Sequence, residues 1–220
     1  MKMHGRLALA ALLLTAALAV ASCGGSTESG SSGSDMQGMD HDEMNGGESG
    51  DVKGTNRGTA SGMVMEDGKY SDEAFVDAMV PHHRGAVAMA EVALENAEHR
   101  EIQSLARNII SSQRAEIEEM RSLKEEISST SDVPMQMSEK DMEDMGMMPD
   151  PGELANRESF DEAFIDAMIP HHQSAIQMAR IAAERSENPD IQTLAEDIIT
   201  AQRKEIEQMK TWREDWYPEG

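Results

Sequence analysis

The feature that most constrains the fold is an internal repetition, in which one segment of the chain returns 89 residues later. Residues 73–125 align with residues 162–214 without a gap, and 28 of the 53 aligned positions are identical. Apolar residues recur in both segments at a period close to 3.6, which predicts amphipathic helices rather than strands. We therefore expect the same helical unit twice in tandem.

Each repeated segment is predicted to form two helices joined by a short turn. Ser71 is expected to cap the first leading helix, and Ser159-x-x-Glu162 reads as a capping box for the second. Asn188-Pro189 marks the turn of the second segment, because proline commonly opens a helix. The apolar face of the first leading helix consists of Phe75, Met79, His82, Ala86, Met89, Ala90, Ala93 and Ala97.

Two such hairpins can bury their apolar faces against each other, which one hairpin alone cannot do. The predicted fold is therefore all-α, a four-helix bundle made of hairpins at residues 70–127 and 159–217. Packing within one chain is favoured over separate hairpins in a dimer, and the oligomeric state stays open. Residues 23–69 and 128–158 contain few large aliphatic side chains, which predicts disordered, Met-rich linkers.

The N-terminus has the pattern of a bacterial lipoprotein signal peptide over residues 1–22. Lys2 and Arg6 precede an apolar stretch of about 14 residues, which is shorter than the roughly 20 that a transmembrane helix needs. Val20-Ala21-Ser22-Cys23 resembles a lipobox, which implies lipid attachment to Cys23. We expect an exported protein anchored at the outer face of the cell membrane or on the periplasmic side. The alternative is an ordinary secreted protein with a stray cysteine.

The charge of the chain argues against a nucleic-acid partner. Its formal charge is −23, and loss of Lys2 and Arg6 with the signal peptide makes it −25. Nucleic-acid binding proteins present a basic face instead. An acidic surface most often serves solubility, although it also attracts cations. Acidity alone therefore identifies no partner.

The sequences AMVPHHRGAVAMA (78–90) and AMIPHHQSAIQMA (167–179) place two adjacent histidines and two methionines on each leading helix. The proline before them either kinks the helix or begins it. One histidine on an apolar face is more often a hydrogen-bonded core residue, but adjacent pairs beside methionines in both segments favour metal ligation. The candidate ligands on these helices are Met79, His82, His83, Met89, Met168, His171, His172 and Met178.

Polar residues of the second helices are expected to face these histidines. With a turn centred near His99, antiparallel pairing places Glu116 opposite His82. An unpaired buried polar group costs about 1–3 kcal/mol, so Glu116 is expected to bind the metal or to hold a histidine. The alternative is an edge position that reaches water. The further candidates are Met120, Glu205 and Met209 as ligands, with Gln113 and Gln202 supporting them.

These donors favour copper. Thioether sulfur is soft and selects Cu(I), and imidazole accepts copper, zinc or iron. We therefore expect Cu(I) to be favoured over Cu(II), with zinc and iron disfavoured. Eleven of the 19 methionines lie in the linkers, where no core needs them. The tracts MQGMDHDEM (36–44) and MEDMGMM (142–148) are expected to capture copper; low-complexity drift and docking on the bundle are the alternatives.

The motifs together resemble a known bacterial family. Met-[Val/Ile]-Pro-His-His-x-x-Ala-[Val/Ile]-x-Met-Ala, followed by Leu-Ala-x-x-Ile-Ile-x-x-Gln-x-x-Glu-Ile-x-x-Met, is similar to the "domain of unknown function 305" family. The resemblance implies exported, ferritin-like helical bundles, some of them associated with copper binding or copper resistance. It covers both segments, which implies two tandem copies in a lipoprotein. It supplies no established reaction.

Three functions remain open at this point. The first is a copper-binding protein that sequesters copper or delivers it to an accepting protein. The second is a metal-dependent oxidase of ferritin-like type, which the lack of an acid, base or nucleophile cluster in the sequence disfavours. The third is a helical interaction module without metal. We expect the first, without enzymatic turnover.

Overall fold

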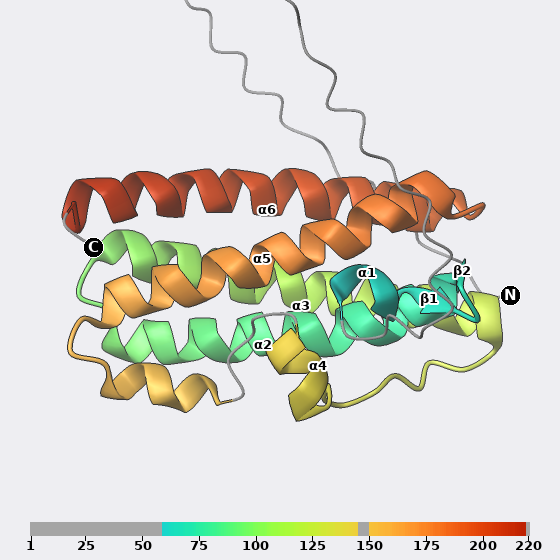
Figure 1. Ribbon diagram of the computed structural model, residues 1–220, viewed down its shortest axis with the longest axis horizontal. Coiled ribbons are helices and arrows are strands. Elements are labelled where there is room, and N and C mark those ends of the chain that lie inside the picture. The colour runs from blue at the N-terminus through green and yellow to red at the C-terminus, as the bar shows by residue number, and fades with distance from the viewer. Residues whose placement is uncertain (1–58, 145–149, 219–220) are drawn as a thin grey trace, which may run out of the picture. The chain divides into compact units, whose positions relative to one another are not determined.

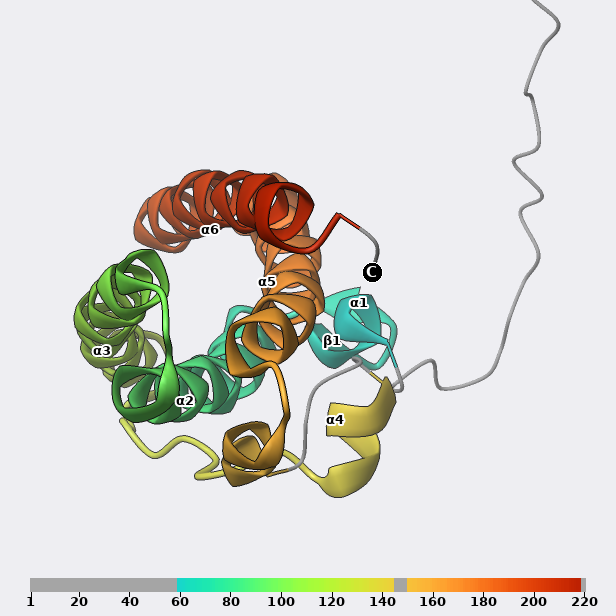
Figure 2. The same ribbon diagram turned by 90° about the vertical axis from the view of Figure 1, so that its left-hand side faces the viewer.

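The computed structural model describes residues 59–144 and 150–218 of the chain. Within them, the long helices are α2 (Asp72–Asn96), α3 (Arg100–Ser128), α5 (Phe160–Arg185) and α6 (Pro189–Trp216). They run side by side in Figure 1, and the end-on view in Figure 2 shows them grouped around a common core. The predicted all-α, four-helix architecture is confirmed.

The four helices pack as two hairpins. Helix α2 packs most extensively on α3, and α5 on α6, while α2 also packs against α5 and joins the hairpins. Pro189 is the first residue of α6 and Asn188 is its N-cap, as expected for this turn. None of the helices in the described ranges is long and apolar enough to cross a membrane.

The leading helices begin well before their prolines. Pro81 and Pro170 lie inside α2 and α5, so the alternative in which proline opens the helix is wrong. Proline inside a helix costs about 3 kcal/mol. Here the turns before each proline bury side chains of the core, among them Phe75 and Phe164, which are fully buried. We infer that this burial offsets the cost.

The two helix caps differ from each other. Ser71 Oγ accepts a hydrogen bond from the Ala74 backbone N–H at 3.2 Å, as predicted. Ser159 is the N-cap of α5, but its side chain makes no capping hydrogen bond, so the predicted capping box with Glu162 is wrong. The carboxylate of Glu162 instead pairs with Arg213 of α6 at 2.8 Å. Glu162 therefore forms an ion pair between helices instead of the local hydrogen bond that a capping box requires.

The core divides into two clusters of buried side chains. One contains Phe75, Met79, Met120 and Met178, and the other contains Met89, Phe164, Met168 and Met209. Along α2 the first cluster ends at Val80 and the second begins at Ala86. The histidine pair of α2 lies in the gap between them, and the same holds on α5. The histidines therefore interrupt the apolar core halfway along the bundle.

The segments predicted as disordered linkers contain ordered parts, which corrects that expectation. Before α2 lie α1 (Ala60–Met63), β1 (Met65–Glu66) and β2 (Lys69–Tyr70), the two strands being antiparallel. Their turn uses Asp67 and Gly68, both with positive φ, as tight hairpins require. Between the hairpins lie α4 (Glu139–Asp144) and the 3-10 helix η1 (Pro151–Asn156).

Single buried apolar residues explain why these parts of the predicted linkers have a defined structure. Leu154 of η1 is fully buried in the second core cluster, and η1 packs against α2 and α5. Ala60 and Val64 are buried in the first cluster. The average composition of a segment does not reveal such isolated anchors. Cys23, the tract at 36–44 and the end of the tract at 142–148 lie outside the described residues.

Candidate metal centre

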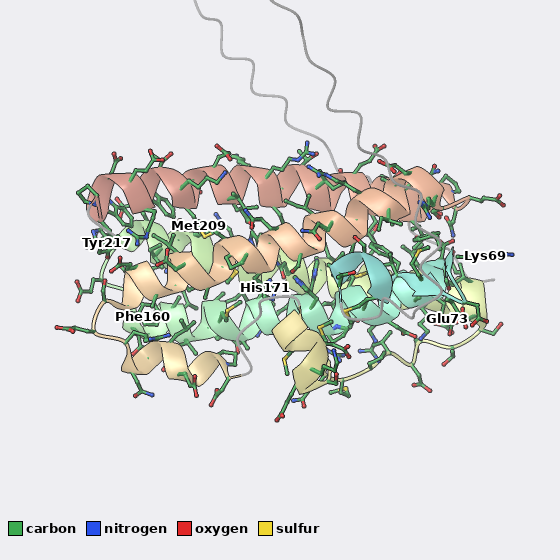
Figure 3. All side chains as sticks on the ribbon, in the orientation of Figure 1. Lys69, Glu73, Phe160, His171, Met209 and Tyr217 are labelled. Carbon is green, nitrogen blue, oxygen red and sulfur yellow. The ribbon has the colours of Figure 1, made fainter. Side chains whose placement is uncertain are left out.

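The four histidines of the repeated motif meet at mid-length in the bundle. Figure 3 shows His171 between the end marked by Phe160 and Tyr217 and the end marked by Lys69 and Glu73. All four imidazoles are buried. The rings of His82 and His171 lie closest, with centroids 3.9 Å apart and planes tilted by 49°. The interface between α2 and α5 thus brings together one histidine from each repeated segment.

The other histidine of each pair is held by a glutamate. His83 Nε2 lies 2.8 Å from Glu116 Oε2, and His172 Nε2 lies 2.8 Å from Glu205 Oε2. The expectation that Glu116 faces His82 is therefore wrong. Neighbouring residues on a helix point about 100° apart, so His82 turns toward α5 while His83 turns toward α3. The idea that a glutamate holds a histidine is correct, with His83 as the partner.

Ser174 fixes the protonation pattern of His82. Ser174 Oγ donates to the main-chain carbonyl of His171 at 2.7 Å, which uses its only proton. Its 2.8 Å contact with His82 Nε2 must then be one in which the imidazole N–H donates. The Nδ1 atom of neutral His82 is left with a lone pair, and this buried atom has no hydrogen-bond partner among the described residues.

His171 is the least satisfied of the four. Both of its ring nitrogens are buried without a hydrogen bond of normal geometry in the described part of the chain. The main chain of His82 has only a weak contact with this ring, which slightly favours its charged form. Native proteins pair most buried polar side-chain atoms, so two orphan nitrogens on one ring point to a missing partner.

Burial also keeps the central imidazoles neutral. The pKa values of His82 and His171 lie well below the usual 6.5, first because burial penalises the charged form and then because neighbouring histidines repel it. A neutral imidazole has the free lone pair that a metal needs, whereas a protonated one does not. At neutral pH both rings are therefore in the form that binds metal.

The six candidate methionines in the bundle divide by cluster rather than surrounding one point. Met79 and Met120 of the first hairpin share a cluster with Met178 of the second. Met168 and Met209 share the other with Met89. All six are essentially fully buried. Each group therefore combines thioethers from both hairpins, on opposite sides of the histidines.

Further thioethers come from the segment between the hairpins. A cavity of about 380 Å³ lies beside α2 and is lined by Met89, Met135, Met137, Met142 and His171, among other residues. Arg84 holds this segment in place, because its Nη1 donates to the carbonyls of Pro134 at 3.0 Å and Met135 at 3.3 Å. Met142 of the tract at 142–148 thus lines the same cavity as His171, and the capture of copper by this tract stays a prediction.

The two glutamines behind the histidines are buried, as predicted. Gln113 and Gln202 are each 2 % exposed, and side-chain atoms of both lack partners in the described ranges. The expectation that they bond the histidines is not met. Within the same ranges, no three histidine, cysteine, aspartate or glutamate side chains gather as a metal site. The additional donors beside His171 are thioethers instead.

One polar group outside the motif was not predicted. Asp161 of α5 is buried and accepts hydrogen bonds from the backbone N–H groups of Glu98 and His99, and it contacts His99 Nδ1 at 2.7 Å. The His99 ring stacks on Trp216, which stacks on Trp212. These contacts close one end of the bundle. His99 has no counterpart in the second segment, so repetition gave no signal for it.

A match to a protein-family model shows which family the chain belongs to. The model described as "Domain of unknown function (DUF305)" matches residues 72–213, which include all four long helices up to Arg213. The chain belongs to the DUF305 family. The match runs across both hairpins, and the expectation of two separate tandem copies stays a prediction.

Solved structures of similar proteins agree with this fold. CopM in its Cu(I)-bound form is 41% identical, with a TM-score of 0.60 over 68% of this chain and 99% of CopM. The Cu(II)-bound form gives 42%, a TM-score of 0.62, and 67% and 99% coverage. A DUF305 fragment from Deinococcus radiodurans is 29% identical, with a TM-score of 0.57 over 64% and 93%.

A curated relative adds little about function. "Uncharacterized protein L153" of Acanthamoeba polyphaga mimivirus is 41% identical over 51 residues, 23% of this DUF305 chain. The match spans about a third of that relative, 34% of its length. Its printed name states no activity. The likeness to CopM, which has been solved in Cu(I)-bound and Cu(II)-bound forms, is therefore the comparison that bears on metal binding.

Proposed function

We propose that this protein is an exported, lipid-anchored copper-binding protein that sequesters copper or hands it to an accepting protein outside the cytoplasm, without turnover. Cu(I) is its favoured ion. The observation that carries the proposal is the buried, neutral His171, whose ring nitrogens have no hydrogen bond of normal geometry among the described residues and which lines a cavity together with methionine side chains. Imidazole and thioether together suit copper better than zinc or iron.

The likeness to CopM supports the same ion. The printed descriptions of CopM name Cu(I)-, Cu(II)- and silver-bound forms. Silver(I) is a soft monovalent ion, which thioether donors favour. The residues proposed to form the metal site are the four histidines, Glu116, Glu205 and six methionines: Met79, Met89, Met120, Met168, Met178 and Met209. The glutamates act through His83 and His172, which they orient for binding through Nδ1.

Metal titration of the chain without residues 1–22 tests the copper proposal. We expect tight uptake of Cu(I), weaker uptake of Cu(II), and little of Zn(II) or Fe(II). The variant His82→Ala/His83→Ala/His171→Ala/His172→Ala is expected to lose bundle-bound copper, because every imidazole donor of the motif is gone. The corresponding quadruple glutamine variant keeps more side-chain volume and replaces the alanine variant if circular dichroism shows that the latter is unfolded.

Two results would contradict this proposal. If a folded quadruple variant binds as much copper as the wild type, the histidines are core residues and the protein is a helical interaction module. Metal-dependent oxygen consumption by the loaded wild-type protein would indicate an oxidase instead of a binding protein.

The lipid anchor has its own test. Expression of the full chain in a bacterium is expected to place the protein in the membrane fraction, because Cys23 follows the signal sequence of a lipoprotein. The Cys23→Ser variant removes the sulfur that would carry the lipid and is expected in the soluble exported fraction. If the two proteins distribute alike between the fractions, the protein is not anchored through Cys23.

A further inference from the structure

The two repeated segments differ at one position that decides whether the Nε2 atom of the facing histidine is free. Ser174 in the second segment corresponds to Gly85 in the first, just as His171 corresponds to His82. Ser174 Oγ lies 2.8 Å from His82 Nε2 and occupies that nitrogen. On the other side, a Cβ atom at position 85 would lie 3.3 Å from His171 Nε2. The residue facing His171 is a glycine, so it presents no hydroxyl there.

The open side of His171 coincides with the cavity that the linker covers. Gly85, Met89, Met137, Met142 and His171 all line it. Met89 is 2 % exposed, and Met137 and Met142 are half-buried. Thioether side chains from α2 and from the inter-hairpin segment thus line the same cavity as an imidazole whose Nε2 atom has no hydrogen-bond partner among the described residues. The His82 nitrogen that faces Ser174 has no such opening, because its hydrogen bond is already made.

The residue before Gly85 strengthens this asymmetry. Arg84 anchors the segment that carries Met135 and Met137, whereas the second repeat has Gln173 at the corresponding position. Arg84 Nη1 also lies 3.5 Å from Met135 Sδ, so this sulfur already accepts a hydrogen bond. Met135 is 72% exposed as well. The thioethers best placed for a ligand are therefore those of Met89, Met137 and Met142.

We propose that the chain holds one soft monovalent metal ion in this cavity, bound by His171 Nε2 and the thioethers of Met89, Met137 and Met142, and that Gly85 is the residue that keeps the site open. The inference rests on the proposed copper function and names its site. It makes the two repeated segments different in function, because Ser174 caps Nε2 of His82 whereas Nε2 of His171 is available to metal. Because one donor set comes from the linker, the linker is part of the site.

Competition for Cu(I) against a coloured chelator, without oxygen, tests the role of Gly85. The Gly85→Ser variant is expected to bind Cu(I) about tenfold more weakly, because a serine hydroxyl would occupy His171 Nε2 and this hydrogen bond must break before metal binds. Serine is a better helix former than glycine, so the variant should fold. Unchanged Cu(I) affinity in Gly85→Ser would overturn the proposal.

Histidine and methionine variants identify the ligands. His171→Gln is expected to lose this Cu(I) site, while His82→Gln loses less, and His99→Gln at the bundle end serves as a matched control. Met137→Leu/Met142→Leu is expected to weaken binding, whereas Met63→Leu/Met65→Leu is not, because these two methionines line a different cavity. Equal losses in the two double variants would exclude a site that depends on the inter-hairpin segment.

The same measurements separate this inference from the proposed function. If the unaltered protein takes up no Cu(I), the copper function itself fails. If it takes up Cu(I) but His171→Gln and His82→Gln lose it equally, copper binding stands and the asymmetric site is wrong.

Discussion

Acidification below pH 6.5 is expected to destabilise the protein steeply, because His82 and His171 must stay uncharged in the folded state. Their folded-state pKa values lie well below 6.5, owing to burial and then to the neighbouring histidines. The unfolded chain takes up protons near pH 6.5, so it binds more protons than the folded chain as the pH falls. The part of the unfolding free energy that depends on these two neutral rings is therefore fully present above about pH 6.5 and decreases as the pH falls below it.

The expected size of this effect is large for a single domain. Each imidazole removes about 1.4 kcal/mol of unfolding free energy per pH unit below 6.5, for as long as its folded form stays neutral. The two rings together remove about twice that, against a total stability on the order of 5–15 kcal/mol. Urea unfolding of the metal-free protein at a series of pH values measures the slope directly.

A double variant isolates the contribution of these two rings. His82→Gln/His171→Gln removes both titrating groups and should flatten the dependence of stability on pH between 6.5 and 5. The variant retains His83 and His172 with Glu116 and Glu205, so effects of those pairs remain in both proteins. Parallel curves for the variant and the wild type would show that His82 and His171 do not account for the acid sensitivity.

Truncation of Phe164 to alanine is expected to cost about 3–5 kcal/mol of unfolding free energy, because it leaves a cavity in a packed core. Phe164 is fully buried in the second core cluster, on α5 in the turns before Pro170. Phe75 occupies the corresponding place in the first cluster, so Phe75→Ala should cost a similar amount. Thermal and urea unfolding measure both.

An exposed residue of a long helix gives the matched control for this truncation. Leu94 of α2 is 37% exposed, and its replacement by alanine should change the unfolding free energy by about 0.5 kcal/mol or less. Similar losses for Phe164→Ala and Leu94→Ala would contradict the placement of the two core clusters, and with it the burial that we infer offsets the internal prolines.

Periodicity predicted the helices and the inward position of the histidines, because both follow from local spacing along one helix. The faces of α2 that contain Phe75, Met79 and His82 are buried as the 3.6-residue pattern requires. The antiparallel pairing of residues across the hairpin was less accurate. It paired Glu116 with the wrong histidine. Residues at the same height on the two helices of a hairpin need not face each other, and height alone does not determine which of two adjacent side chains points toward the partner helix.

Contacts between the hairpins could not be predicted in this way. The proximity of His82 to His171 and of Ser174 to His82 depends on how α2 packs against α5. Such contacts join residues about 90 positions apart and have no local signal in one sequence. The difference between Gly85 and Ser174 is visible in the repeat alignment, but its meaning follows only from that packing.

The inter-hairpin segment shows a second limit of prediction from the sequence. Its composition predicts disorder, yet Leu154 is fully buried and Arg84 binds the carbonyls of Pro134 and Met135. One buried leucine and one arginine contribute to placing the segment on the bundle, together with Met137 and Met142, which pack against the first core cluster. A compositional average cannot detect them, because most of the remaining residues are polar, small or methionine.

Crystals of the protein loaded with Cu(I), examined by anomalous diffraction at the copper absorption edge, locate the metal most directly. We predict a copper peak inside the bundle, bonded to His171 Nε2 and to methionine sulfur. Copper found only on surface carboxylates, with all four imidazoles unbound, would contradict the claim that imidazole and thioether groups from separate segments converge to hold it.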